Sequence, residues 1–200
     1  MVYINMQGLD RRQTAIMMAQ FKKAIAAPNE FIKFSLKTDS VNEWYILLSG
    51  FEGNDSEYTY TENGEMKFGE YLCRMVAPAD FPFNPPEFYM LTENGLYGIE
   101  EKVCISIGEF HAKDYRAALG MAGFAEQLVS GLIGWKELGN GIRIIKTTAG
   151  KKSKLAKYSR EYNYNVHPDI MNAINSSYAE YSSKWDLTKI PAPMREKLGL

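Results

Sequence analysis

The residues best suited to covalent chemistry lie close together in the middle of the chain. Cys104 offers a thiol, which is a strong nucleophile once it is ionised. Asn94, ten residues earlier, offers a carboxamide that could donate a hydrogen bond to an oxyanion during acyl transfer. His111, seven residues after the cysteine, offers an imidazole that could act as a base near neutral pH.

Each of these residues also has a structural interpretation. Cys104 lies in the apolar pentapeptide 103–107, and isolated cysteines in such surroundings are more often packed than reactive. Asn94 precedes a glycine, which is a common turn pair, and a lone histidine is more often structural than catalytic. The residue types alone leave both interpretations open. The second cysteine, Cys73, lies within a predicted strand, so we expect it to be structural.

The elements that must position these residues follow from hydrophobic periodicity and turn signals. Apolar spacing predicts helices over 10–27, 122–136, 151–164 and 168–184. Alternation and β-branched or aromatic content predict strands over 31–37, 44–49, 71–76 and 88–91, with a long loop or hairpin tip at 50–66. We therefore predict an α+β fold: an N-terminal helix, a four-stranded antiparallel meander, an active-site loop over 92–110 and C-terminal helices. One domain is expected over residues 1–185, followed by a loosely held tail over 186–200.

Composition excludes several classes of protein. A net charge of −1 gives no bulk attraction to nucleic acid, and no apolar run approaches the length of a membrane span. Two cysteines and two histidines do not suggest a disulfide framework or a metal site. Sequence signatures of nucleotide-binding loops, zinc proteases and serine hydrolases are absent from the 200 residues. We expect no metal, no cofactor, no transmembrane segment and a location in the cytoplasm or nucleus.

The order of several strings resembles the ubiquitin-conjugating enzyme family. The run Phe81-Pro82-Phe83-Asn84-Pro85-Pro86 is similar to its proline-rich loop, and it comes before the asparagine and the cysteine. Thr92-Glu93-Asn94-Gly95 resembles a Thr-Pro-Asn-Gly string of the tail-anchored branch that serves endoplasmic-reticulum-associated degradation. Val103-Cys104-Ile105-Ser106-Ile107, followed by Phe110-His111, is also similar to that branch. The resemblance covers roughly residues 10–180, and we expect the branch's membrane anchor to be absent.

The resemblance implies a mechanism for the three reactive residues. Cys104 would carry ubiquitin as a thioester, received from a ubiquitin-activating enzyme that uses the ATP. Asn94 would stabilise the oxyanion or hold the loop beside the cysteine. His111 would orient or deprotonate the incoming nucleophile, which is an amine or, as a further hypothesis, the hydroxyl of Ser or Thr on a protein substrate.

The resemblance also implies two protein contacts. A ubiquitin ligase would contact the proline-rich loop through Phe83, Pro82 and Pro85. The activating enzyme would bind the cations of the first helix, which are Arg11, Arg12, Lys22 and Lys23. Without the resemblance, those cations are equally well explained as a solvated helix face. Two other functions stay open: a non-catalytic binding module of the same fold, and a conjugating enzyme for another ubiquitin-like modifier.

Overall fold

The chain forms a helix, then a series of strands, then further helices. The computed structural model describes residues 10–49, 58–103, 114–133 and 147–200. The helices are α1 (Arg11–Ala24), α2 (Gly120–Ile133), α3 (Ala149–Val166), α4 (Pro168–Ser182) and α5 (Ala192–Leu198), with short 3-10 turns η2 (Ala117–Leu119) and η4 (Leu187–Lys189). The strands are β1 (Ile32–Lys37), β2 (Ser40–Leu48), β3 (Thr59–Glu62), β4 (Glu65–Phe68), β5 (Tyr71–Val76) and β6 (Glu87–Met90). This order confirms the predicted α+β fold.

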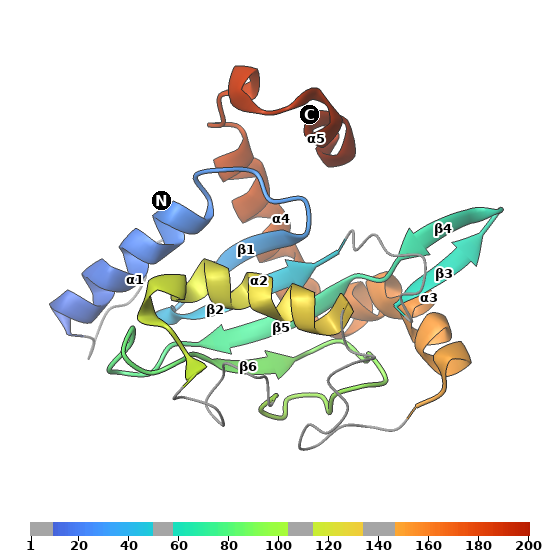
Figure 1. The fold of residues 1–200 in the computed structure, drawn as a ribbon, viewed down its shortest axis with the longest axis horizontal. Coiled ribbons are helices and arrows are strands. Elements are labelled where there is room, and N and C mark those ends of the chain that lie inside the picture. The colour runs from blue at the N-terminus through green and yellow to red at the C-terminus, as the bar shows by residue number, and fades with distance from the viewer. Residues whose placement is uncertain (1–9, 50–57, 104–113, 134–146) are drawn as a thin grey trace.

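Four strands form one antiparallel sheet in the order β1-β2-β5-β6, which confirms the predicted meander. Between β2 and β5 the chain forms a separate two-stranded hairpin, β3–β4. The hairpin turns at Asn63 and Gly64, whose φ angles of 53° and 83° are the positive values that a tight hairpin turn requires. The described part of the predicted loop is therefore a hairpin that extends away from the sheet (Figure 1).

Alternate residues of the four strands build the main core on one face of the sheet. Phe34, Ile46, Cys73 and Met90 are neighbours across successive strands, and all four are buried. Buried side chains of α1 and α2 complete this core, and Figure 1 shows α2 lying across the sheet. The burial of this apolar surface is the main favourable contribution to folding.

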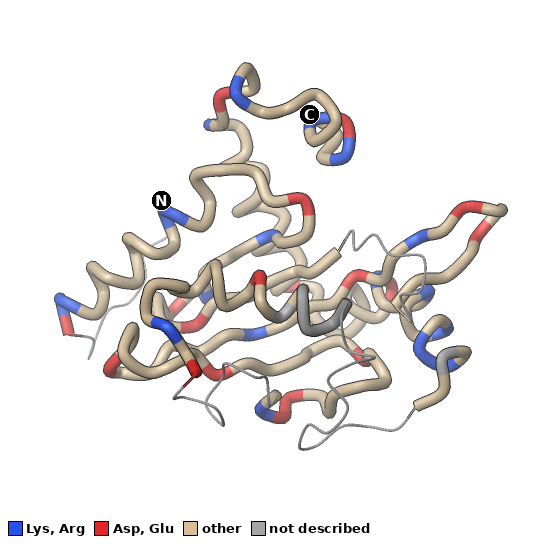
Figure 2. The backbone as a smooth tube through the Cα atoms, in the orientation of Figure 1, with Lys and Arg blue, Asp and Glu red and all other residues tan. Residues whose placement is uncertain are grey.

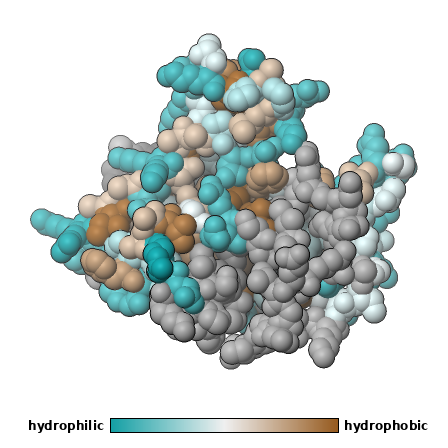
Figure 3. All heavy atoms as spheres, viewed as in Figure 1, coloured by the Kyte–Doolittle hydropathy of each residue, from teal (hydrophilic) through white to brown (hydrophobic). Residues whose placement is uncertain are grey.

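α1 begins where the sequence predicts and ends three residues earlier than predicted. Asp10 caps the helix through its side chain, and the last helical residue is Ala24. The apolar spacing that predicted this helix corresponds to its packed side, because Met17 and Phe21 are buried and the Phe21 ring meets Trp44 edge-on at 5.2 Å. α1 also contacts α2, and apolar atoms gather where the two helices approach each other (Figure 3).

The opposite face of the sheet is covered in part by the late helices, which confirms the two helices predicted after residue 150. α4 packs on β1 and β2, and α3 contacts β5 and α4. A second apolar cluster joins this face to α4 through Leu47, Leu72, Leu91, Met171 and Ile174. In the described part of the molecule, α2 therefore lies on one side of the sheet and α4 on the other, while α3 lies by the β3–β4 hairpin and contacts β5 (Figure 1).

The last fifteen residues are more ordered than the loosely held tail that the sequence indicates. They form η4 and α5, and Ile190 between them is buried. Lys197 of α5 forms an ion pair with Glu30, with 3.0 Å between Nζ and Oε2. This segment thus contacts the connection between α1 and β1, and a domain boundary at residue 185 stays a prediction.

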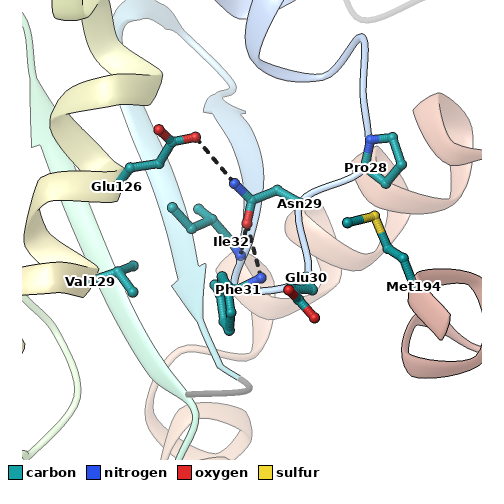
Figure 4. A pocket seen from close by; sticks show the side chains of 8 residues that line it. All are labelled: Pro28, Asn29, Glu30, Phe31, Ile32, Glu126, Val129 and Met194. Carbon is teal, nitrogen blue, oxygen red and sulfur yellow. Dashed lines mark hydrogen bonds between the residues drawn. The ribbon is translucent and has the colours of Figure 1, made fainter. Parts of the chain in front are cut away.

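A cavity of about 400 Å³ lies between that connection, α2 and α5 (Figure 4). Asn29 at its edge accepts hydrogen bonds from the N–H groups of Phe31 and Ile32 and donates to Glu126 at 3.4 Å. The lining residues are Pro28, Asn29, Glu30, Phe31, Ile32, Glu126, Val129 and Met194. None of them belongs to the chain between 91 and 103, so the cavity is separate from the candidate site.

Candidate active site

The segment that leads to Cys104 doubles back along β6. After a reversal, Ile99 lies beside Met90, and the N–H of Glu100 donates to the Met90 carbonyl at 2.9 Å. Val103 is buried, and its N–H donates to the carbonyl of Phe88 at 2.8 Å. The residue immediately before the candidate nucleophile is therefore attached to the sheet. Cys104 itself and His111 lie outside the described residues.

Asn94 organises the reversal through hydrogen bonds to main-chain groups. Its side chain is 1% exposed, and its Oδ1 accepts from the N–H groups of Leu96 at 2.9 Å and Tyr97 at 2.7 Å. Its Nδ2 donates to the carbonyls of Thr92 at 3.0 Å and Tyr97 at 3.3 Å. Both functions of the carboxamide are thus engaged within the loop. This geometry favours the loop-holding role over direct donation to an oxyanion.

α3 packs on the outside of this loop. Gly95 has a φ of 75°, and a Cβ placed there would lie 3.1 Å from Cγ of Lys152 and 3.2 Å from Cδ1 of Leu155. A larger residue at 95 would therefore need both a strained backbone and small displacements of these two side chains. At the other end of α3, a ring nitrogen of His167 lies 3.3 Å from the carbonyl oxygen of Leu91. The loop is therefore held between β6 and α3.

Charged and aromatic groups fix the returning segment to β6. Lys102 lies 2.6 Å from one carboxylate oxygen of Glu87, and the hydroxyl of Tyr89 donates to the other at 2.5 Å. Burial alone would raise the pKa of Glu87, but the hydrogen bonds from Lys102 and Tyr89 outweigh it and lower that pKa. Burial and the bond to Glu87 raise the pKa of Tyr89 to about 12. Lys102, two residues before Cys104, is thus attached to β6 through Glu87.

Of the two cysteines, Cys73 belongs to the described residues and Cys104 does not. Cys73 is a residue of β5 whose side chain is fully buried in the main core, and burial raises the pKa of its thiol well above the ordinary value. Its complete burial in the main core agrees with the structural role predicted for Cys73. The nucleophilic role predicted for Cys104 stays a prediction.

Comparisons with known proteins identify relatives of the chain. Ubiquitin-conjugating enzyme E2 6 of Kluyveromyces lactis is 26% identical over 158 residues, which are 76% of this chain and 58% of that protein. Ubiquitin-conjugating enzyme E2 J2 of Mus musculus is 31% identical over 123 residues, which are 60% of this chain and 46% of that protein. The chain is therefore similar in sequence to curated ubiquitin-conjugating enzymes over 60–76% of its length. Both names agree with the branch that the strings around Asn94 and Cys104 resemble.

The chain spans about half the length of the curated relatives that it matches. No protein-family model matches it. Among solved structures, human ubiquitin-conjugating enzyme E2 G1 is 22% identical and matches 62% of this chain and 98% of its own, with a TM-score of 0.48. Among residues 10–49, 58–103, 114–133 and 147–200, no helix has both the length and the apolar composition needed to span a bilayer.

The proline-rich loop over residues 81–86 displays one exposed aromatic residue. Phe83 is 77% exposed, whereas Phe81 and Pro85 on either side are buried and Pro82 is half-buried. The loop is closed by hydrogen bonds from the Phe81 N–H to the Pro78 carbonyl at 3.1 Å and from the Phe83 N–H to the Asp80 carbonyl at 3.0 Å. Buried anchors thus hold an exposed ring in place, as a recognition surface requires.

The four cations of α1 form two groups and not one patch. Arg11 and Arg12 lie in the first turn, Lys22 and Lys23 lie in the last turn, and all four are exposed. Figure 2 shows positive charge at the two ends of this helix. A partner that contacted all of them would have to extend along the whole length of α1.

Three residues that hold the loop had no functional role in the sequence analysis. Thr92, Asn163 and His167 all contact the loop or its ends. Thr92 lies next to the predicted site, but Asn163 and His167 lie on or after α3, far along the chain. One signal could have singled out Asn163. It is a polar residue on the side of a predicted helix that is expected to be buried.

Proposed function

We propose that this chain accepts ubiquitin as a thioester on Cys104 and transfers it to an amine on a protein substrate. The observation that carries the proposal is the similarity to curated ubiquitin-conjugating enzymes over three quarters of the chain. The attachment of Val103 to β6 supports it, because a nucleophile next to a fixed residue has a restricted position. Ubiquitin, an activating enzyme and a ligase are the partners that this function requires.

The proposed reaction has two acyl-transfer steps. In loading, the Cys104 thiolate attacks the thioester carbonyl of ubiquitin on the activating enzyme, so that one C–S bond forms and the other breaks. In discharge, an amine attacks the Cys104 thioester, the C–N bond forms, the C–S bond breaks and the amine loses a proton. Loading exchanges one thiolate for another and needs no strong base. His111 is proposed to assist discharge by orienting the amine or accepting its proton.

The proline-rich loop and the cations of α1 are proposed to bind the ligase and the activating enzyme. Phe83, with Pro82 and Pro85, would contact the ligase, and the cations of α1 would bind an acidic surface of the activating enzyme. The dependence of the loading rate on ionic strength tests the second contact, since exposed charges are screened by salt. ATP would be consumed by the activating enzyme, so no cofactor is proposed for this chain.

The test of the function is an adduct gel. Incubation with activating enzyme, ATP and ubiquitin should produce an adduct that a thiol reductant removes. Cys104→Ala should abolish the adduct, Cys104→Ser should give an ester that resists the reductant, and Cys73→Ala should still load. Loading that survives Cys104→Ala would contradict the proposal.

The same assay separates the remaining functions. An adduct with another ubiquitin-like modifier, and none with ubiquitin, would change the modifier and keep the chemistry. No adduct with any modifier would favour a binding module. Discharge to free lysine, serine and threonine in competition distinguishes amine from hydroxyl acceptors.

A further inference from the structure

A buried hydrogen-bond network joins α3 to the loop at the point where the chain leaves β6. The hydroxyl of Thr92 donates to Oδ1 of Asn163 and accepts from the N–H of Leu72 at 2.6 Å. Nδ2 of Asn163 donates to the carbonyl of Glu70 at 2.9 Å. Thr92 and Asn163 are fully buried, so neither has water as an alternative partner.

The network continues from Thr92 to Asn94. The carbonyl of Thr92 accepts from Nδ2 of Asn94, which in turn fixes the N–H groups of Leu96 and Tyr97. A continuous path of hydrogen bonds therefore runs from Asn163 on α3 through Thr92 to Asn94. The path ends on the segment that returns along β6 to Val103.

The geometry points to Asn163 as a positioning residue for acyl transfer at Cys104. Asn163 holds Thr92, Thr92 holds Asn94, and Asn94 sets the shape of the reversal that precedes the nucleophile. This role rests on the proposed function. It predicts that α3, which contributes no reacting group, controls the rate of discharge.

A nearby serine offers a matched control. Ser159 on α3 is also buried, accepts from the N–H of Glu70 at 2.7 Å and donates to the carbonyl of Ala156 at 2.8 Å. It attaches the same helix to Glu70, the residue before β5, as Asn163 does, but among the described residues it forms no hydrogen bond with Thr92. Ser159→Ala therefore reproduces the loss of a buried anchor without cutting the path to the loop.

The experiment measures single-turnover discharge of preloaded enzyme to free lysine. Asn163→Ala should slow the maximal rate between about tenfold and a hundredfold, because small displacements of reacting groups have large kinetic effects. The lysine concentration that gives half the maximal rate should be unchanged, since the acceptor contacts are intact. Ser159→Ala should stay within about threefold of the wild type even if it lowers the unfolding midpoint as much as Asn163→Ala does.

Two further variants separate positioning from general destabilisation. Thr92→Val removes the hydroxyl and keeps the shape, so it should reproduce the slow discharge, whereas Thr92→Ser should restore it. The double variant of Thr92→Val and Asn163→Ala should be little slower than either single variant, because both interrupt one path. Additive losses would contradict the path.

Asn163→Asp adds a pH test. The aspartate can still accept from Thr92, but its second oxygen faces the Glu70 carbonyl and must be protonated to donate. Burial of the carboxyl favours its neutral form, so the discharge rate relative to wild type should rise as the pH falls. Discharge as slow as that of Asn163→Ala at every pH, even in acid, would contradict the proposed hydrogen bond.

Failure of the inference can be distinguished from failure of the proposed function. If wild-type protein forms no thioester, the proposed function fails. If it forms the thioester and the Asn163 and Ser159 variants discharge alike, the function stands and the positioning role is wrong. Slow discharge in the Asn163 variants and normal discharge in the Ser159 variant would support the role.

Discussion

A single carboxamide determines the conformation of the loop that leads to Cys104. Asn94 accepts from two main-chain N–H groups and donates to two main-chain carbonyl groups, all within residues 92–97. All of them lie in a buried stretch where unpaired polar groups are costly. The residue thus has a structural function that is independent of any contact with the reacting carbonyl.

This function predicts how Asn94→Ala behaves. The free energy of unfolding should fall by about 1–3 kcal/mol, because the main-chain groups of Leu96 and Tyr97 lose buried partners. Amide hydrogen exchange at these two residues should accelerate, and discharge should slow more than loading. Denaturant unfolding and exchange measured by NMR are the relevant experiments. Slow discharge with unchanged stability and exchange would instead assign the carboxamide to the oxyanion.

At the scale of elements, the proline-rich loop combines a rigid base with an exposed ring. Phe81 is 2% exposed and Phe83 is 77% exposed, although they are two residues apart in the same loop. Proline residues restrict the backbone before folding and so reduce the entropy lost when the loop is ordered. The ring of Phe83 is therefore presented to a partner at low conformational cost.

The loop predicts a separation of two activities. Phe83→Ala should leave loading and discharge to free lysine within about twofold of wild type, since the loop contributes no reacting group. Discharge stimulated by a cognate ligase should fall by about tenfold or more, as expected for an exposed aromatic anchor. Tyr158→Ala, at another exposed aromatic residue on α3, is the matched control. Equal loss of ligase stimulation in both variants would argue against a specific contact.

The elements were predictable to different degrees. Strict alternation from Ile32 to Leu36 and apolar spacing in α1 are local patterns, and local patterns predicted the four-stranded sheet and the helices α1 to α4. The packing of α4 on the back of the sheet depends on contacts between residues far apart in sequence, which periodicity does not encode. The helix α5 was missed because it has only seven residues, with one proline before it and another in its first turn, and carries a weak apolar pattern.

The residues of the candidate site were also predictable to different degrees. The asparagine and the proline-rich loop were found from their types and order, and the turn at Asn94-Gly95 has the positive φ that such a pair predicts. The contacts of Asn163 and His167 with the loop could not be predicted, because each joins residues more than seventy positions apart. Sequence reasoning thus identified the residues of the loop and missed the helix that holds it.

For the molecule as a whole, stability depends on pH through charges at the site. The pKa of Glu87 is lowered in the folded state from an ordinary value of 4.5 by its bonds to Lys102 and Tyr89, against the effect of burial. A lowered pKa means that the carboxylate stabilises the fold above its unfolded pKa, and that this contribution disappears as the pH falls through the folded value.

Glu87→Gln should therefore lower the unfolding midpoint at neutral pH and have progressively less effect in acid. Circular dichroism melts in steps from neutral to about pH 3 would measure the difference between the variant and the wild type. Glu161→Gln, at an exposed residue of α3, is the control for loss of a surface carboxylate. A difference that stays constant down to the lowest pH would show that the Glu87 carboxylate does not stabilise the fold through its charge.

The distance along the chain between Thr92 and Asn163 has a consequence for biosynthesis. A ribosome releases the N-terminal part of a protein first, so the sheet and residue 104 emerge before α3 does. The hydroxyl of Thr92 has no acceptor on α3 until Asn163, 71 positions later, has been translated. A nascent chain therefore completes its sheet well before the loop next to Cys104 is secured, and the last step in maturation of the site awaits the C-terminal third of the protein.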